Sequence, residues 1–218
     1  MPNVFTPRVN LLARASIVGF VILLATAGVF AYGYMYSSFS TGVGIEVDQP
    51  VPFSHQHHVG AIGIDCRYCH TTVEDSAFAG MPSTQTCMNC HSRLWTDAPM
   101  LEPIRESWRT GTPIRWQRVH VLPDHVYFNH SIHVAKGIGC VTCHGRVDQM
   151  GLVRKEVALH MRWCLDCHRD PKEFVRPKDK LLDMAWRPAA DDEADRDALF
   201  DQYNIRLMAM TDCSTCHR

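Results

Sequence analysis

The stretch Cys66-Arg67-Tyr68-Cys69-His70 contains two cysteines three positions apart and a histidine directly after them. This Cys-x-x-Cys-His pattern occurs five times in the 218 residues and uses all ten cysteines. It is the attachment signature of c-type haem, in which both thiols bond to the porphyrin and the histidine is the proximal iron ligand. The sequence therefore predicts five covalently bound haem c groups. The expected thioether cysteines are Cys66, Cys69, Cys87, Cys90, Cys140, Cys143, Cys164, Cys167, Cys213 and Cys216, and the expected proximal histidines are His70, His91, His144, His168 and His217.

Zinc and disulfides explain the pattern less well than haem does. A structural zinc site joins two Cys-x-x-Cys pairs, whereas this chain has five pairs, and zinc gives no reason for a histidine after each one. A disulfide across two residues is strained and needs no histidine. Haem attachment is therefore the interpretation that accounts for every cysteine and for the histidine that follows each pair.

Two similar stretches precede the first and third motifs: FSHQHH at residues 53–58 and FNHSIH at residues 128–133. Each is followed by two attachment motifs, so the chain reads as an internal duplication. Histidines three positions apart lie on one face of a helical turn and can reach two different irons. His57 aligns with Ile132 in the other copy, so we expect it to be a bystander. The expected distal ligands are His55, His58, His130 and His133.

The distal ligand of the fifth haem stays open at this level. His120 lies before the second unit, His160 and Met161 lie just before the fourth motif, and Met81 follows a glycine. A thioether ligand would raise the potential of that haem above its bis-histidine neighbours, although methionine more often serves as packing material. We favour His120 or Met161, with His160 next, and interpret His125 as a loop residue.

An uncharged segment near the N-terminus predicts a membrane anchor. Residues 15–35 are apolar enough and long enough to cross a bilayer, since 21 helical residues extend roughly 31 Å. Arg8 and Arg14 precede the segment, so we expect the N-terminus in the cytoplasm and the haem domain in the periplasm, on a bacterial inner membrane crossed once. A cleaved signal peptide is the alternative, but the apolar stretch continues past the candidate cleavage site at residues 25–27.

The expected fold is mainly irregular with short α-helices, a multihaem class III-like cytochrome c domain behind one transmembrane helix. The residues after the anchor are too few for a separate core around each of five haems. The net charge of −1 gives no electrostatic basis for nucleic-acid binding. One helix is expected over residues 191–210. The expected organisation is a cytoplasmic N-terminus (1–14), a transmembrane helix (15–36), a linker (37–52), dihaem unit 1 (53–96), a connector (97–127), dihaem unit 2 (128–170) and a C-terminal segment with the fifth haem (171–218).

The paired histidine stretches and attachment motifs resemble those of the class III multihaem cytochrome family. The anchor together with DCRYCHTT (65–72), TCMNCH (86–91), YFNH (127–130), CHGRVDQM (143–150) and WCLDCH (163–168) is similar to the pentahaem membrane-anchored subunit (ActA) of alternative complex III. That resemblance implies iron–sulfur and quinol-binding membrane subunits as partners and a periplasmic acceptor, a cytochrome c, a copper protein or an oxidase. It also implies a haem ligand at Met161.

Three functions agree with such a chain to different degrees. An electron relay needs closed, six-coordinate haems and no catalytic site of its own, which the supply of histidines matches. A self-sufficient quinol dehydrogenase of the NapC/NrfH type has the same layout, but its Cys-x-x-Cys-His-x-Met variant is missing, because residues 71–72 are Thr-Thr and residues 92–93 are Ser-Arg. A multihaem reductase keeps an open iron position, often with lysine replacing a proximal histidine, and every motif here ends in histidine. We therefore expect a relay.

Overall fold

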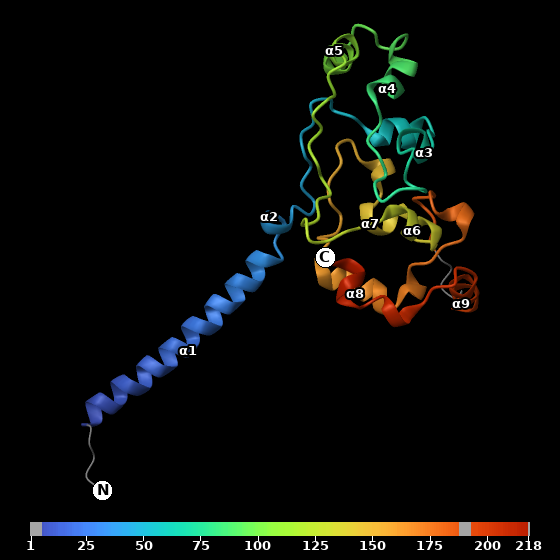
Figure 1. Ribbon diagram of the computed structural model, residues 1–218. Helices are drawn as coiled ribbons and strands as arrows, with labels where there is room; N and C mark the ends of the chain where they lie inside the picture. Colours follow the sequence, from blue (N-terminus) through green and yellow to red (C-terminus); the bar gives the residue numbers. More distant parts are fainter. Residues whose placement is uncertain (1–5, 188–192, 218) are drawn as a thin grey trace. The chain divides into compact units, whose positions relative to one another are not determined.

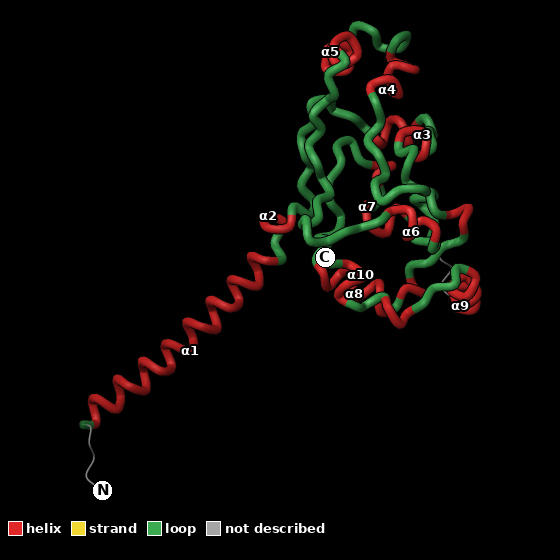
Figure 2. The backbone as a smooth tube through the Cα atoms, viewed as in Figure 1, coloured by secondary structure: helices red, strands yellow, loops and turns green. Residues whose placement is uncertain are grey.

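The computed structural model describes residues 6–187 and 193–217, with the side chains of residues 193 and 194 left out (Figure 1). The chain divides into two units, Met1–Val43 and Gly44–Arg218. In the described part of the chain the regular structure is helical and contains no β-strand, only isolated bridges (Figure 2). The predicted fold class, short helices joined by irregular segments, is confirmed.

The first unit contains the long helix α1 (Pro7–Met35) and the short helix α2 (Ser38–Thr41). Pro7 suits the start of α1, because its fixed φ fits a helix and its missing N–H would have had no partner there. None of the residues of α1 is buried. With 29 residues and a hydropathy of 2.1, α1 is the one helix of the described chain that is long and apolar enough to cross a membrane.

The second unit is built from short helices that carry the attachment motifs (Figure 2). A helical turn places the two cysteines of a motif on one face, which explains why each pair lies within a helix. The helix α5 (Glu102–Thr110) carries no motif, and the π-helical turn η1 (Gln56–Ala61) contains His58. The helices that carry an attachment motif are α3 (Cys66–Cys69), α4 (Thr84–His91), α7 (Cys140–His144), α8 (Met161–Arg169) and α10 (Cys213–Cys216). The other two α-helices described in this unit, α6 (His130–Ala135) and α9 (Glu193–Gln202), carry no motif.

The apolar core made by the polypeptide is small. Val51, Leu101 and Ile104, at 3%, 6% and 4% exposure, form a cluster beside α4 and α5. Met150 is the most buried large side chain among the described residues, at 1% exposure. Burial on this scale is thin for a domain of this length, so bound porphyrins would supply much of the interior.

The helix expected over residues 191–210 is shorter than predicted. The helix α9 ends at Gln202, and residues 191–192 lie outside the described residues. Tyr203 turns into the protein, where its hydroxyl donates to the carbonyl of Arg176 at 2.6 Å, and Asn204 follows in the left-handed region with φ 47°. Lys136 Nζ donates to the carbonyl of Tyr203 at 2.8 Å. These tertiary contacts end the helix, and the sequence pattern does not contain them.

Candidate haem-binding site

Three of the histidines expected to be proximal ligands are held by the backbone in the orientation that a metal ligand needs. The Nδ1–H groups of His70, His91 and His168 donate to backbone carbonyls at 2.7, 3.1 and 2.8 Å. Because a carbonyl only accepts, Nδ1 carries the proton and Nε2 keeps its lone pair for a metal. The attachment motifs therefore present imidazole rings in the tautomer that binds iron.

Three of the four expected distal histidines are oriented in the same way. The Nδ1–H groups of His58, His130 and His133 donate to backbone carbonyls at 2.8, 2.8 and 2.7 Å. Phe53 stacks on His58 with 4.4 Å between ring centres and 20° between planes, and Phe128 stacks on His133 with 4.5 Å and 26°. The two copies of the repeat thus hold their rings alike, which supports the duplication inferred from sequence.

Three pairs of histidine rings have the separation expected of two ligands on one iron. Two metal–nitrogen bonds of about 2 Å each, with about 1 Å from each nitrogen to its ring centre, separate the ring centres by roughly 6 Å. The measured separations are 6.2 Å for His58 and His91, 6.4 Å for His130 and His144, and 6.2 Å for His133 and His168. These residues fit a haem iron bound between two imidazoles at the second, third and fourth motifs.

His55 lies next to the proximal histidine of the first motif. Burial, followed by the nearby charges of His70 and His58, lowers the pKa of His55 to about 4. Its Nδ1 is buried and has no hydrogen-bond partner in the described part of the chain. A buried imidazole that stays neutral is available to a metal, so His55 fits the remaining position opposite His70.

The candidates for the fifth distal ligand lie in different surroundings. The His120 ring is 4.3 Å from the His144 ring, too close for an iron between them, and its Nε2 is buried without a partner among the described residues. Met161, at the start of α8, is 57% exposed, and His160 is the N-cap residue of that helix. The ring that faces His217 belongs instead to His125, with 5.5 Å between centres and 24° between planes.

His57, the expected bystander, lies edge-on to the His58 ring, with 5.2 Å between ring centres. Its ring stacks on the Trp95 ring with 5.4 Å between centres and 27° between planes. An aromatic contact of this kind is a packing role, which agrees with the alignment of His57 with Ile132 in the repeat.

Neighbouring motifs adjoin in the order second, first, third, fourth, fifth. Asn89 of the second motif donates to the Tyr68 hydroxyl of the first at 3.0 Å. The backbone N–H of His130, which faces the third motif, donates to the carbonyl of Ala77, in the loop after the first motif, at 3.2 Å. Burial, followed by Cys66 of the first motif, raises the pKa of Cys140 in the third motif to about 11.

The fourth motif lies between the third and the fifth. Burial, followed by the nearby Cys167 of the fourth motif, raises the pKa of the Cys143 thiol to about 12. Burial, followed by the nearby Cys216 of the fifth motif, raises the pKa of the Cys164 thiol. His168 Nδ1 donates to the carbonyl of Met210, which lies just before α10, at 2.8 Å. The helices α8 and α10 also lie together in Figure 2. The five motifs therefore form one continuous row.

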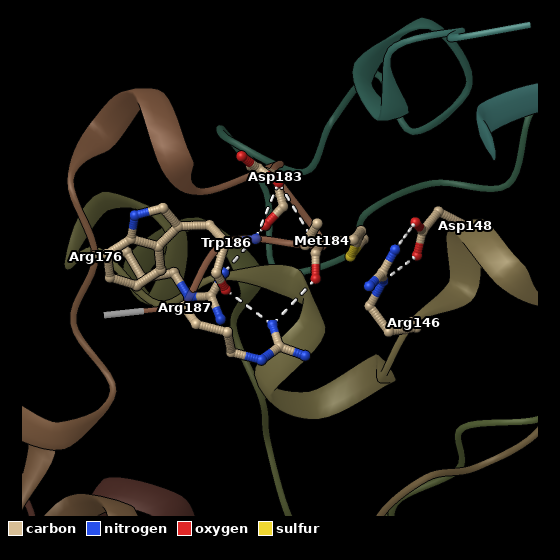
Figure 3. Close-up of polar contacts among 8 residues, drawn as sticks. Arg146, Asp148, Arg176, Asp183, Met184, Trp186 and Arg187 are labelled. Carbon is tan, nitrogen blue, oxygen red and sulfur yellow. Dashed lines mark hydrogen bonds and ion pairs between the residues drawn. The ribbon is translucent and has the colours of Figure 1, made fainter. Parts of the chain in front are cut away.

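A buried arginine, Arg176, lies next to the third motif, close to Gly139. Figure 3 shows this arginine together with Asp183 and Trp186. Arg176 is 7% exposed, its guanidinium lies 5.0 Å from the centre of the Trp186 ring, and its Nη1 donates to the carbonyl of Asp183 at 3.2 Å. A Cβ on Gly139, the residue before Cys140, would lie 2.5 Å from Cδ of Arg176. Burial, followed by Arg187, lowers the pKa of Arg176. A buried cation at this position favours electron density on a nearby redox group.

Comparisons with known proteins agree with this architecture. Residues 36–104 match the class III cytochrome c family, and residues 126–218 match cytochrome c7 and related cytochromes c. A stretch of 98 residues is 39% identical to the menaquinone reductase, multiheme cytochrome c subunit, of Nitratidesulfovibrio vulgaris (strain Hildenborough), and covers 44% of this chain and 46% of that protein. Residues 36–104 are therefore similar to class III cytochromes c, and residues 126–218 are similar to cytochrome c7, in agreement with the predicted resemblance.

Proposed function

We propose that this chain is a membrane-anchored pentahaem cytochrome c that relays electrons from a quinol-oxidising partner to a periplasmic acceptor within alternative complex III. The observation that carries the proposal is the continuous row of five attachment motifs, four of them with a second histidine ring facing the motif histidine and the first with His55 next to His70. Haem iron supplies reversible one-electron redox chemistry when it is bound at such a motif.

The residues of the chain close the iron sites and connect them. Two imidazoles per iron leave no open position for a substrate, which favours a relay over a multihaem reductase. The helix α6 carries both His130 and His133, which face the third and fourth motifs. One short helix thus supplies ligands to two adjacent haem sites. The haem sites then form a path for electrons and not a pocket for a substrate.

Partners and location follow from the anchor and from the relative. The apolar helix α1 would hold the chain in the bacterial inner membrane, and the arginines Arg8 and Arg14 favour a cytoplasmic N-terminus and a periplasmic haem domain. The relative is named as a subunit of a menaquinone reductase, which supports assembly with a quinone-binding membrane subunit. Iron–sulfur subunits and a periplasmic cytochrome c, copper protein or oxidase complete the proposed chain of carriers.

The name of the relative favours a second candidate, a relay that works in the opposite direction. In a menaquinone reductase, electrons enter the quinone instead of leaving a quinol. A third candidate, a self-sufficient quinol dehydrogenase, is favoured by α1, the one apolar helix of membrane-spanning length among the described residues. Only the third candidate places the quinol site on this chain.

Anaerobic stopped-flow mixing distinguishes these candidates. The haem-loaded full chain and the native membrane complex are each mixed with reduced menaquinol and followed at the haem α-band. The proposal predicts that the complex is reduced rapidly and in an inhibitor-sensitive way, whereas the isolated chain is not. Rapid reduction of the isolated chain contradicts the proposal and favours the quinol dehydrogenase. A complex that is reduced by periplasmic donors and then reduces menaquinone, but is not itself reduced by menaquinol, favours the opposite direction.

A further inference from the structure

We infer that His125 is the distal iron ligand at the fifth motif, opposite His217. The ring centres lie 5.5 Å apart and the ring planes differ by 24°. The pairs at the second, third and fourth motifs have separations of 6.2 to 6.4 Å. This inference rests on the proposed haem attachment and completes a histidine pair at the end of the row.

The backbone holds His125 against the fifth motif. Val126 forms an antiparallel bridge with His217, and the Tyr127 N–H donates to the carbonyl of Cys216 at 3.1 Å. The Tyr127 hydroxyl also donates to the carbonyl of Ser214, so three residues of the motif are contacted, Ser214, Cys216 and His217. Two segments that are about 90 positions apart in the chain are thereby held side by side. Backbone contacts between these segments bring the His125 and His217 rings together.

A tight turn presents the His125 ring. The Val126 N–H donates to the carbonyl of Pro123 at 2.9 Å, which closes the turn that contains His125. Proline fixes its own φ, so it stiffens the approach to the turn. His125 and Cys213 are both exposed in the polypeptide alone, which places the fifth site at the surface of the domain.

The other candidates do not share this arrangement. His120 lies against His144 at the third motif, and the Met161 side chain is 57% exposed at the start of α8. An all-histidine set means that the fifth haem would have a potential in the range of its neighbours, because a methionine ligand would raise it. The end of the row would then be set apart by its exposure and not by its ligand type.

Electron paramagnetic resonance of the ferric, haem-loaded full chain tests the assignment. In His125→Ala, one of the five haems is expected to change from low-spin to high-spin, with five haems still attached by the pyridine haemochrome assay. Added imidazole is expected to restore the low-spin signal, which a general loss of structure would not allow. In His125→Met, the same haem is expected to gain the charge-transfer band of a methionine–iron bond.

A matched variant covers the competing ligand. Met161→Leu is expected to leave all five haems low-spin. If His125→Ala leaves every haem low-spin, or if Met161→Leu produces the high-spin signal, the assignment is wrong. These spectra do not depend on quinol chemistry, so failure of the proposed relay and failure of the His125 assignment would be recognised separately.

Discussion

Backbone carbonyls determine which ring nitrogen of each histidine carries the proton. Six ligand candidates donate Nδ1–H to a main-chain oxygen, and each thereby exposes Nε2 to the space in front of the ring. A hydrogen bond from the far nitrogen of a ligand ring to a carbonyl fixes the orientation of the ring and raises the basicity of the ligand. The acceptors belong to the main chain, and two of them come from distant segments, Ala77 for His130 and Met210 for His168, so the tertiary fold takes part in setting this orientation.

The pair of adjacent histidines His57 and His58 gives a direct test at this scale. His58→Ala removes the ring that lies 6.2 Å from His91, so one of the five haems is expected to become high-spin. His57→Ala removes a ring that packs on Trp95 and against the edge of His58, so this variant is expected to leave all haems low-spin. Electron paramagnetic resonance of the two ferric variants gives the answer, and equal spectra would contradict the pairing.

Arg176 provides a test of local charge. Replacing this buried cation in Arg176→Gln should lower the potential of the haem at the third motif by on the order of tens of millivolts, because a positive charge nearby stabilises the reduced state. Arg109→Gln on α5 removes a charge whose side chain is 72% exposed and is expected to change no potential. Potentiometric titration of both variants measures the difference, and identical titration curves would show that Arg176 does not act on a haem.

At the scale of elements, the two repeats build similar ring geometry from different turns. His130 and His133 lie on the α-helix α6, whereas His55 precedes and His58 lies within the π-helical turn η1. In η1 a Cβ on Gly60 would lie 2.3 Å from the carbonyl oxygen of Asp148, so this close approach requires a glycine, whereas the aligned residue of the second copy is Ala135. Sequence periodicity predicts the shared face of the histidines but not this difference in winding.

The distal ligand of the fifth haem could not be predicted from the sequence. The motifs, the repeat and the apolar helix could be predicted, because each is a local pattern of a few residues. His125 belongs to no repeat, and a bridge between Val126 and His217 brings it to its position. The only local signal was its place in a turn after Pro123, which is also typical of an ordinary loop residue. Contacts between distant segments of this kind cannot be deduced from spacing.

The contact between Gly137 and Tyr203 gives a stability test for the C-terminal elements. Gly137 has a φ of +83°, and a Cβ there would lie 2.3 Å from the Tyr203 ring. Gly137→Ala is therefore expected to lower the free energy of unfolding by about 1–3 kcal/mol. Gly151→Ala is the control, since its Cβ would meet nothing within 4 Å. Thermal unfolding of the two haem-loaded variants measures the difference. Equal melting temperatures for Gly137→Ala and Gly151→Ala would contradict the expected loss of stability.

At the scale of the whole molecule, the order of the motifs in space differs from their order in sequence. The contacts place the first motif between the second and the third. The second and fifth motifs are then the two ends of the row, and these are the positions where electrons would enter and leave. A row of this kind accounts for the small apolar core, because the chain is organised around its cofactors.

Removal of single motifs within the native complex tests this row most directly. One variant carries Cys66→Ala and Cys69→Ala in the first motif, and its control carries Cys87→Ala and Cys90→Ala in the second. Each would retain four haems, checked by the pyridine haemochrome assay before stopped-flow reduction at the α-band. Loss of the first motif is predicted to isolate the haem of the second, so that one of the four remaining haems reacts at a different rate from the other three. Loss of the second motif, an end of the row, is predicted to leave four haems that react together. If the first-motif variant also reacts as one set of four, the spatial order and the relay built on it are contradicted.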